Sequence, residues 1–147
     1  WIRTNVQDPV LVGPDAESAQ WVSAVAALAS APWMALEKVR KGDREVEVSI
    51  PDIGRWRTCT PVLVDDIIST ARTQIAAVRH LKTAGLSPPV CIGIHAVFAG
   101  DAYEALGAAG AGRIVTCNSI PHPSNGIDLA PLVSEAVRSL TERAEEA

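Results

Sequence analysis

The sequence has few aromatic residues, no excess of basic residues and no long apolar run. Aromatic side chains make up 4% of its 147 residues, and the formal net charge is −4. A broad nucleic-acid-binding surface needs an excess of lysine and arginine, so this charge argues against one. No apolar run approaches the ~20 residues of a membrane-spanning helix, and no secretory signal peptide opens the chain. We therefore expect a soluble, cytoplasmic protein with neither a nucleic-acid nor a membrane partner.

Cysteine is also scarce, and the chain does not begin with methionine. Cys59, Cys91 and Cys117 are far apart, which predicts neither a zinc motif nor a disulfide framework. Cys91 and Cys117 lie in apolar runs, where a free thiol behaves as a small core residue. Because the chain opens on Trp1, we expect it to be a fragment of a longer protein.

The sequence does have the composition of a globular domain, with 48% apolar and 20% charged residues. Short apolar runs alternate along it with segments of helical periodicity. Strands are predicted at Val10–Val12, Trp33–Glu37, Val46–Ile50, Pro61–Val64, Val90–Val97 and Arg113–Cys117, and helices at Ala16–Ala29, Thr70–Ala84, Asp101–Ala109 and Pro131–Glu145. This order predicts an α/β fold, a mostly parallel twisted sheet with helices on both faces.

Ligands of such sheets bind at the carboxyl ends of the strands. That edge is predicted to contain Gly13–Asp15, Glu37–Arg40, Asp65–Thr73 and the loop after Val97. The charged segment Lys38–Glu45 has no apolar periodicity and is predicted to be a mobile loop. Its cations are either ordinary solvated residues or ligand contacts.

The segment Val62–Thr73 has the most specific chemistry. An apolar strand delivers Asp65 and Asp66 to its end, and a hydroxyl-rich stretch then opens a helix. The first N–H groups of a helix have no internal partner and lie at the positive end of its dipole, so they attract a phosphate. Hydroxyls from Ser69, Thr70 and Thr73 can add donors.

The two acids would repel a bare phosphate, so they need another task. We expect Asp65 and Asp66 to accept hydrogen bonds from sugar hydroxyls or to hold a magnesium ion that the ligand also binds. The structural alternatives are a helix N-terminal capping pair for the acids and an ordinary capping box for Ser69–Thr73.

Val62–Thr73 resembles the phosphoribosyl pyrophosphate signature of type I phosphoribosyltransferases and ribose-phosphate pyrophosphokinases. Three further segments narrow the resemblance to the pyrophosphokinases. Gly13–Ala16 resembles their strand-end aspartate motif, Leu36–Arg40 their catalytic flexible loop, and Ile120–Pro123 with Ile127–Leu132 their C-terminal segment. The resemblance, from about Pro9 to Val137, implies one phosphoribosyltransferase-like domain over residues 1–147, the C-terminal half of a two-domain protein.

The resemblance implies a ribose-phosphate diphosphokinase, which transfers pyrophosphate from ATP to ribose 5-phosphate and so makes phosphoribosyl pyrophosphate. It implies Asp65 and Asp66 as ligands of the ribose hydroxyls, Ser69, Thr70, Ala71, Arg72 and Thr73 as the 5-phosphate loop, Lys38 and Arg40 as catalytic cations, and Asp15 as a ligand of Mg²⁺. It also implies a homo-oligomer. Two alternatives are a phosphoribosyltransferase that uses the same loop and a non-catalytic sugar-phosphate-binding regulatory homologue.

Two further expectations concern single residues. The resembled family usually has glycine where Ala71 stands, so a positive φ there would cost the alanine about 1 kcal/mol or more. Among the histidines, we expect His80 at the surface, His95 at the ligand edge, and His122 either as a packed turn residue or as a ligand.

Overall fold

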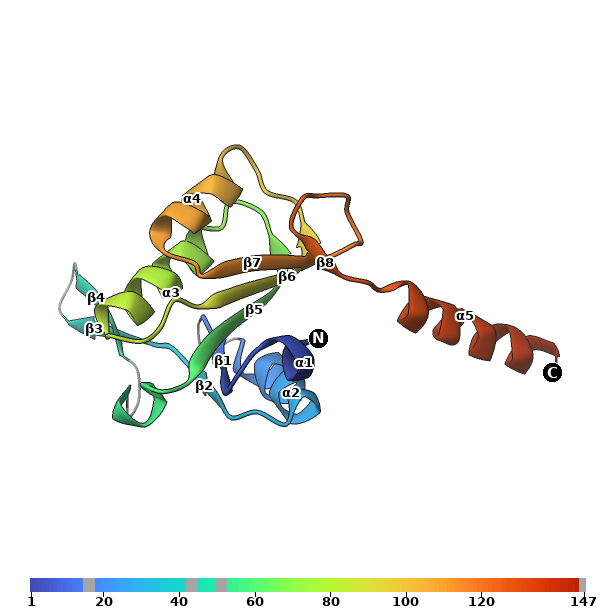
Figure 1. The fold of residues 1–147 in the computed structure, drawn as a ribbon, viewed down its shortest axis with the longest axis horizontal. Coiled ribbons are helices and arrows are strands. Elements are labelled where there is room, and N and C mark those ends of the chain that lie inside the picture. The colour runs from blue at the N-terminus through green and yellow to red at the C-terminus, as the bar shows by residue number, and fades with distance from the viewer. Residues whose placement is uncertain (15–17, 42–44, 50–52, 146–147) are drawn as a thin grey trace.

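The protein is described by a computed structural model that covers residues 1–14, 18–41, 45–49 and 53–145 (Figure 1). Its centre is a six-stranded sheet with the strand order β2-β1-β5-β6-β7-β8. The strands are β1 Pro9–Gly13, β2 Trp33–Ala35, β5 Thr60–Ile68, β6 Val90–Ala96, β7 Arg113–Cys117 and β8 Asn125–Ile127. All neighbouring strands pair in parallel. The predicted α/β fold is confirmed.

Helices cover both faces of this sheet. Helices α1 Ile2–Asn5 and α2 Ala19–Ala29 lie on one face, and α3 Arg72–Thr83 and α4 Ala102–Ala109 lie on the other (Figure 1). A short 3₁₀ turn, Ile53–Trp56, precedes β5. The last helix, α5 Ala130–Glu145, extends away from the body of the domain.

Each face of the sheet has its own apolar core because successive side chains of a strand point to opposite faces. On β1, Leu11 packs in the cluster that contains Val22 of α2. Its neighbours Val10 and Val12 pack in the cluster that contains Leu81 of α3. Central parallel strands are covered on both sides, so they appear in the sequence as continuous apolar runs rather than as alternating patterns.

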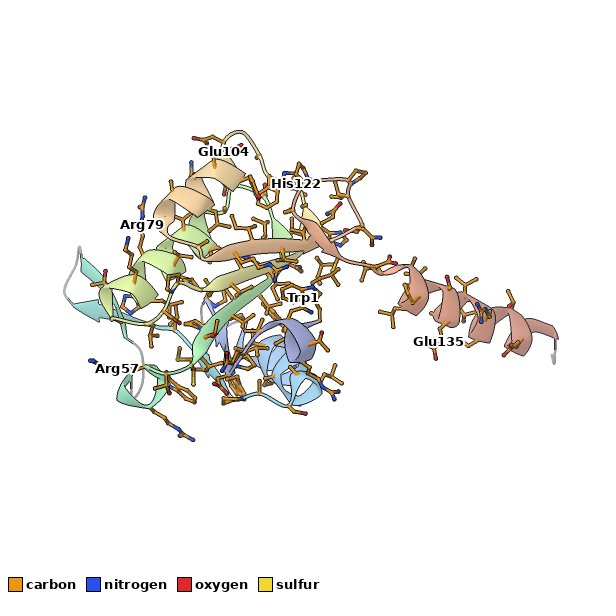
Figure 2. The ribbon with its side chains drawn as sticks, viewed as in Figure 1. Trp1, Arg57, Arg79, Glu104, His122 and Glu135 are labelled. Atoms are coloured by element: carbon orange, nitrogen blue, oxygen red, sulfur yellow. The ribbon has the colours of Figure 1, made fainter. Side chains whose placement is uncertain are left out.

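Outside the core, charged side chains face solvent. Arg79 of α3 and Glu104 of α4 are exposed on the outer side of their helices, and Glu135 projects from α5 (Figure 2). Cys91 and Cys117 are buried free thiols, as predicted, and burial raises the pKa of Cys91 to about 12. No helix in the described ranges is long and apolar enough to cross a membrane.

One predicted loop is wrong. The segment predicted as the loop Lys38–Glu45 begins as β3 Glu37–Lys41, which pairs antiparallel with β4 Glu45–Ser49. The register places Lys38 opposite Val48 and Arg40 opposite Val46. Because β3 is rich in charged residues, it has no apolar pattern from which a strand could be predicted. Its backbone pairs with that of β4. The predicted strand Trp33–Glu37 is correspondingly shorter and ends at Ala35.

The strand that leads into the candidate site is longer than predicted. β5 continues past the two acids to Ile68, and its last residues pair with β6 as Ile67 with His95 and Ile68 with Ala96. Helix α3 accordingly begins at Arg72 rather than at Thr70. The predicted glycine cap is confirmed, since Gly85 has φ +80° and its N–H donates to the Lys82 carbonyl at 3.0 Å.

Candidate functional site

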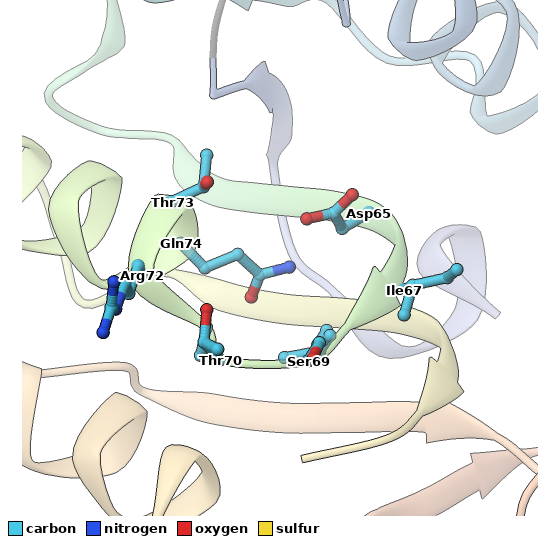
Figure 3. Close-up of a pocket in the computed structure, with 9 residues that line it drawn as sticks. Asp65, Ile67, Ser69, Thr70, Arg72, Thr73 and Gln74 are labelled. Carbon is cyan, nitrogen blue, oxygen red and sulfur yellow. The ribbon is translucent and has the colours of Figure 1, made fainter. Parts of the chain in front are cut away.

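An open pocket of about 110 Å³ lies where β5 leaves the sheet and α3 begins (Figure 3). Its lining residues are Asp65, Ile67, Ile68, Ser69, Thr70, Ala71, Arg72, Thr73 and Gln74. The structure therefore brings together Asp65 and the whole predicted phosphate loop. The Arg72 side chain, however, points away from Asp65 and Gln74.

The amino end of α3 has no side-chain cap. The N-cap residue is Ala71, which has no side chain that can accept a hydrogen bond, and the first bond of the helix runs from the Ile75 N–H to the Ala71 carbonyl at 2.8 Å. Within the described residues, none of the backbone N–H groups from Ser69 to Gln74 donates a hydrogen bond. The capping-box interpretation of Ser69–Thr73 is thus wrong, and the unpaired N–H groups that a phosphate requires are present.

Ala71 adopts the left-handed conformation that this turn demands. Its φ is +56° and its ψ is +8°, and the residue is 7% exposed. An L-residue in this region is destabilised by roughly 1–2 kcal/mol through contact between Cβ and the backbone. The positive φ on which the expected cost depends is present at this alanine.

The two acids belong to the strand and not to the helix. The Asp66 N–H donates to Asp65 Oδ1 at 3.1 Å, and the Ile67 N–H donates to Asp66 Oδ1 at 2.8 Å. Because both carboxylates accept from strand amides, the interpretation as a capping pair of α3 is wrong. Asp65 is half-buried against the pocket, whereas Asp66 is exposed.

Burial makes the Asp65 carboxyl group a weaker acid than an ordinary aspartate. Loss of solvation is the largest effect and, with the nearby charge and side chain of Asp66, it raises the pKa of Asp65 to about 6. The backbone N–H of Asp66 acts in the opposite direction, and so does the Gln74 amide, which faces the carboxylate without completing a hydrogen bond to it. At neutral pH the carboxylate is mostly ionised and can accept hydrogen bonds from hydroxyls.

Gln74 is the site residue that the sequence reasoning missed. Its side chain is 1% exposed, and neither polar atom of its amide group has a hydrogen-bond partner among the described residues. Gln74, Val78 and Leu81 are spaced by four and three residues, so they share the inner face of α3. A polar residue on an otherwise apolar helical stripe was the available signal.

The structure locates the other predicted site residues only in part. Lys38 and Arg40 are residues of strand β3, and Asp15 lies outside the described residues. In the part of the chain that the structure describes, no group of three His, Cys, Asp or Glu side chains is placed to hold a metal ion. Mg²⁺ commonly takes one or two protein carboxylates and completes its shell with phosphates and water, so this finding is compatible with the predicted ion.

Two histidines lie at the carboxyl edge of the sheet. Ser119 donates its hydroxyl proton to the Ile94 carbonyl at 2.7 Å, so it accepts from the His95 Nδ1–H at 2.9 Å. His122 packs against both Phe98 and Tyr103, with ring centroids 4.6 and 4.9 Å away, and its Nδ1 contacts the Ser124 hydroxyl. His122 is therefore the packed turn residue of the two alternatives.

A parallel sheet with an acid-bearing strand, a short loop and an uncapped helix defines the class: a type I phosphoribosyltransferase fold. The chain belongs to the phosphoribosyl transferase domain family, which it matches over residues 1–132.

Relatives in this family are named as pyrophosphokinases. The chain is 33% identical over 142 residues to a ribose-phosphate pyrophosphokinase of Methanopyrus kandleri, covering 95% of this chain and 47% of the relative. It is 31% identical over 145 residues to ribose-phosphate pyrophosphokinase 4 of Saccharomyces cerevisiae, covering 94% and 44%. The predicted resemblance is confirmed, and the chain spans about half the length of these curated relatives.

Solved structures agree on the fold. Phosphoribosylpyrophosphate synthetase from Mycobacterium smegmatis superposes with a TM-score of 0.77 at 24% identity, over 97% of this chain and 47% of that one. Orotate phosphoribosyltransferase from Aeropyrum pernix gives a TM-score of 0.55 at 21% identity, over 74% and 58%.

Proposed function

We propose that this chain is the sugar-phosphate-binding domain of a ribose-phosphate diphosphokinase, acting as the C-terminal half of a homo-oligomeric two-domain protein. The observation that carries the proposal is the row of N–H groups from Ser69 to Gln74, which have no acceptor among the described residues and share one pocket with the half-buried Asp65. The family match and the names of the relatives support it.

The chemistry assigned to this pocket is binding and orientation. The N–H groups and the hydroxyls of Ser69, Thr70 and Thr73 hold the 5-phosphate. The carboxylates of Asp65 and Asp66 accept hydrogen bonds from the ribose hydroxyls, which leaves the 1-hydroxyl free to attack.

The transfer step needs charge neutralisation near the attacking oxygen. Phosphoryl transfer is accelerated mainly by positioning and by cations that stabilise the migrating group, and Lys38 and Arg40 are proposed for that task. When bound, Mg²⁺ neutralises phosphate charge, and Asp15 is proposed to hold it. ATP is the proposed donor.

Binding of ribose 5-phosphate tests the proposal directly. With magnesium present, isothermal titration calorimetry should show binding that the double change Asp65→Asn with Asp66→Asn weakens at least about tenfold, because neutral amides accept more weakly than carboxylates. The matched control is Glu104→Gln with Glu135→Gln, which removes two exposed charges elsewhere and should leave the affinity unchanged. Equal affinity of the Asp65/Asp66 variant and the unmodified chain would exclude the assignment of the acids.

The main alternative is a non-catalytic sugar-phosphate-binding homologue. The left-handed conformation of Ala71 in the phosphate loop favours it. Both functions require sugar-phosphate binding, but only the diphosphokinase forms phosphoribosyl pyrophosphate from ATP and ribose 5-phosphate. A phosphoribosyltransferase would instead consume phosphoribosyl pyrophosphate with a nitrogen base.

A further inference from the structure

The side-chain amide of Gln74 is a buried polar group of the site whose hydrogen bonding is incomplete. Both its oxygen and its nitrogen are shielded from solvent and lack hydrogen-bond partners among the described residues. A buried amide left in this state destabilises a fold, and folded proteins contain few such groups. The other buried residues of α3 are all apolar, so Gln74 is the polar member of that buried face.

The surroundings of Gln74 contain suitable partners on two sides. Its side chain points back from the first turn of α3 into the space enclosed by Asp65, Ser69 and Thr70 (Figure 3). The amide NH₂ can donate to the Asp65 carboxylate, and the amide oxygen can accept from a loop hydroxyl such as that of Thr70. Gln74 thus lies between the acid and the loop, the two parts of the pocket.

We infer that Gln74 is a positioning residue that links the acid binding the sugar hydroxyls to the loop binding the phosphate. This inference rests on the proposed function. When a sugar phosphate fills the pocket, the phosphate draws the N–H groups of residues 69–74 inward and the sugar hydroxyls fix the Asp65 carboxylate. The Gln74 amide then completes hydrogen bonds to both sides.

The consequence is coupling between the two ends of the ligand. Ribose 5-phosphate contacts both ends of the pocket, whereas inorganic phosphate contacts only the loop. The contribution of Asp65 to ribose 5-phosphate binding therefore depends on the residue at position 74. A side chain that only fills space cannot produce this dependence, because residues without a shared interaction contribute additively.

A double-mutant cycle with Asp65→Asn and Gln74→Leu measures the coupling by calorimetry. Leucine keeps the size of the side chain and removes both polar atoms. Asp65→Asn should weaken ribose 5-phosphate binding about tenfold when Gln74 is present and only about two- to threefold beside leucine, since coupled neighbours are non-additive. Gln74→Leu alone should weaken ribose 5-phosphate about fivefold and inorganic phosphate less than about twofold, because phosphate alone does not reach Asp65.

Two further variants keep the result interpretable. Gln74→Met repeats the cycle with a flexible apolar side chain if the leucine variant does not fold, as judged by its circular dichroism and unfolding transition. Gln74→Glu retains an acceptor but places a second carboxylate before Asp65, and it should weaken ribose 5-phosphate more than Gln74→Leu does.

The outcomes separate the two proposals. If Asp65→Asn weakens binding equally in both backgrounds, Gln74 only fills space, or a buried water satisfies it, and the coupling is refuted while the proposed function stands. If ribose 5-phosphate does not bind the unmodified chain at all, the proposed function and the coupling fall together.

Discussion

At the scale of single residues, the site depends on an alanine in a backbone conformation that suits glycine. Ala71 turns the chain from strand into helix with a φ of +56°. The residues that carry the first N–H groups of α3 line the pocket at this turn, and a side chain that could cap these groups is missing from the N-cap position. Strain and the availability of these N–H groups therefore have the same local cause.

Replacing Ala71 by glycine should relieve this strain. We expect Ala71→Gly to raise the free energy of unfolding by about 0.5–1 kcal/mol, because relief of the left-handed conformation outweighs the added chain entropy of glycine. Urea denaturation measures the change. The matched control is Ala77→Gly, which removes an equally buried methyl group from the middle of α3 and should destabilise by about 1 kcal/mol. Destabilisation by both variants would contradict the strain at position 71.

The raised pKa of Asp65 makes a second prediction at this scale. Its pKa is about 6 in the folded chain and about 4 in an unfolded one. Between these values the folded state binds more protons, so the contribution of Asp65 to stability falls as the pH rises from 4 to 6 and stays low above. Asp65→Asn should therefore stabilise the ligand-free chain at pH 7 and change it little at pH 4.

Denaturant unfolding at pH 4.5 and pH 7 checks the prediction for Asp65. The experiment omits ribose 5-phosphate, because a phosphate monoester titrates near pH 6 itself. Glu104→Gln is the control, since it removes an exposed carboxylate with no part in the pocket. A stabilisation by Asp65→Asn that is the same at both pH values would argue against the altered acidity.

At the scale of elements, the site is shaped by how the ends of β5 and β6 are held together. Gly93 of β6 pairs with Asp65, and a Cβ at this glycine would lie 2.6 Å from Ile68 Cδ1. The missing side chain lets Ile68 pack against β6, where the chain turns out of the sheet. The Ile68 and Ser69 carbonyls then accept from the N–H groups of Phe98 and Ala99 at 2.8 and 3.0 Å. The loop after β6 thus holds the start of the phosphate loop.

The sequence located these elements better than it located their ends. An apolar run followed by acids and hydroxyls predicted a strand and a helix around the pocket, and both are present. The end of β5 was predicted too early, because a strand that reaches the ligand edge carries polar residues there, here the two acids. The charged β3 was predicted as a loop for a related reason, since it has no apolar stripe.

The sequence did not predict which side chains of the site lie opposite each other. The spacing placed Gln74 on the inner face of α3, but only the structure brings it opposite Asp65 with both polar amide atoms unpaired among the described residues. In the same way, the raised pKa of Asp65 follows from burial that the sequence does not specify. Patterns therefore predicted where the ligand edge lies, and packing determined its chemistry.

At the scale of the whole molecule, α5 is set apart from the domain. It extends away from the sheet and its covering helices (Figure 1). Leu132, Val133, Val137 and Leu140 are 53–67% exposed, although large apolar residues of an amphipathic helix normally face a core. Hydrogen bonds around Asn118 and Asp128 fix the start of the helix, since the Leu129 N–H donates to Asn118 Oδ1 and the Ala130 N–H to Asp128 Oδ1, each at 2.9 Å. These bonds hold the first residues of α5 and leave the rest of it without tertiary support.

Amide hydrogen exchange can test whether α5 is supported only locally. A helix of 16 residues without tertiary packing is marginally stable in water, because most helical stability in proteins comes from a buried apolar face. In a dilute solution of the chain, we expect amides of residues 134–145 to exchange nearly as fast as in a free peptide of the same sequence. The internal control is α3, whose buried Val78 and Leu81 should give it protection close to that of global unfolding. Protection of α5 equal to that of α3 would mean that its apolar face is covered in solution. Slow exchange that appears only at high concentration would identify the cover as a second copy of the chain.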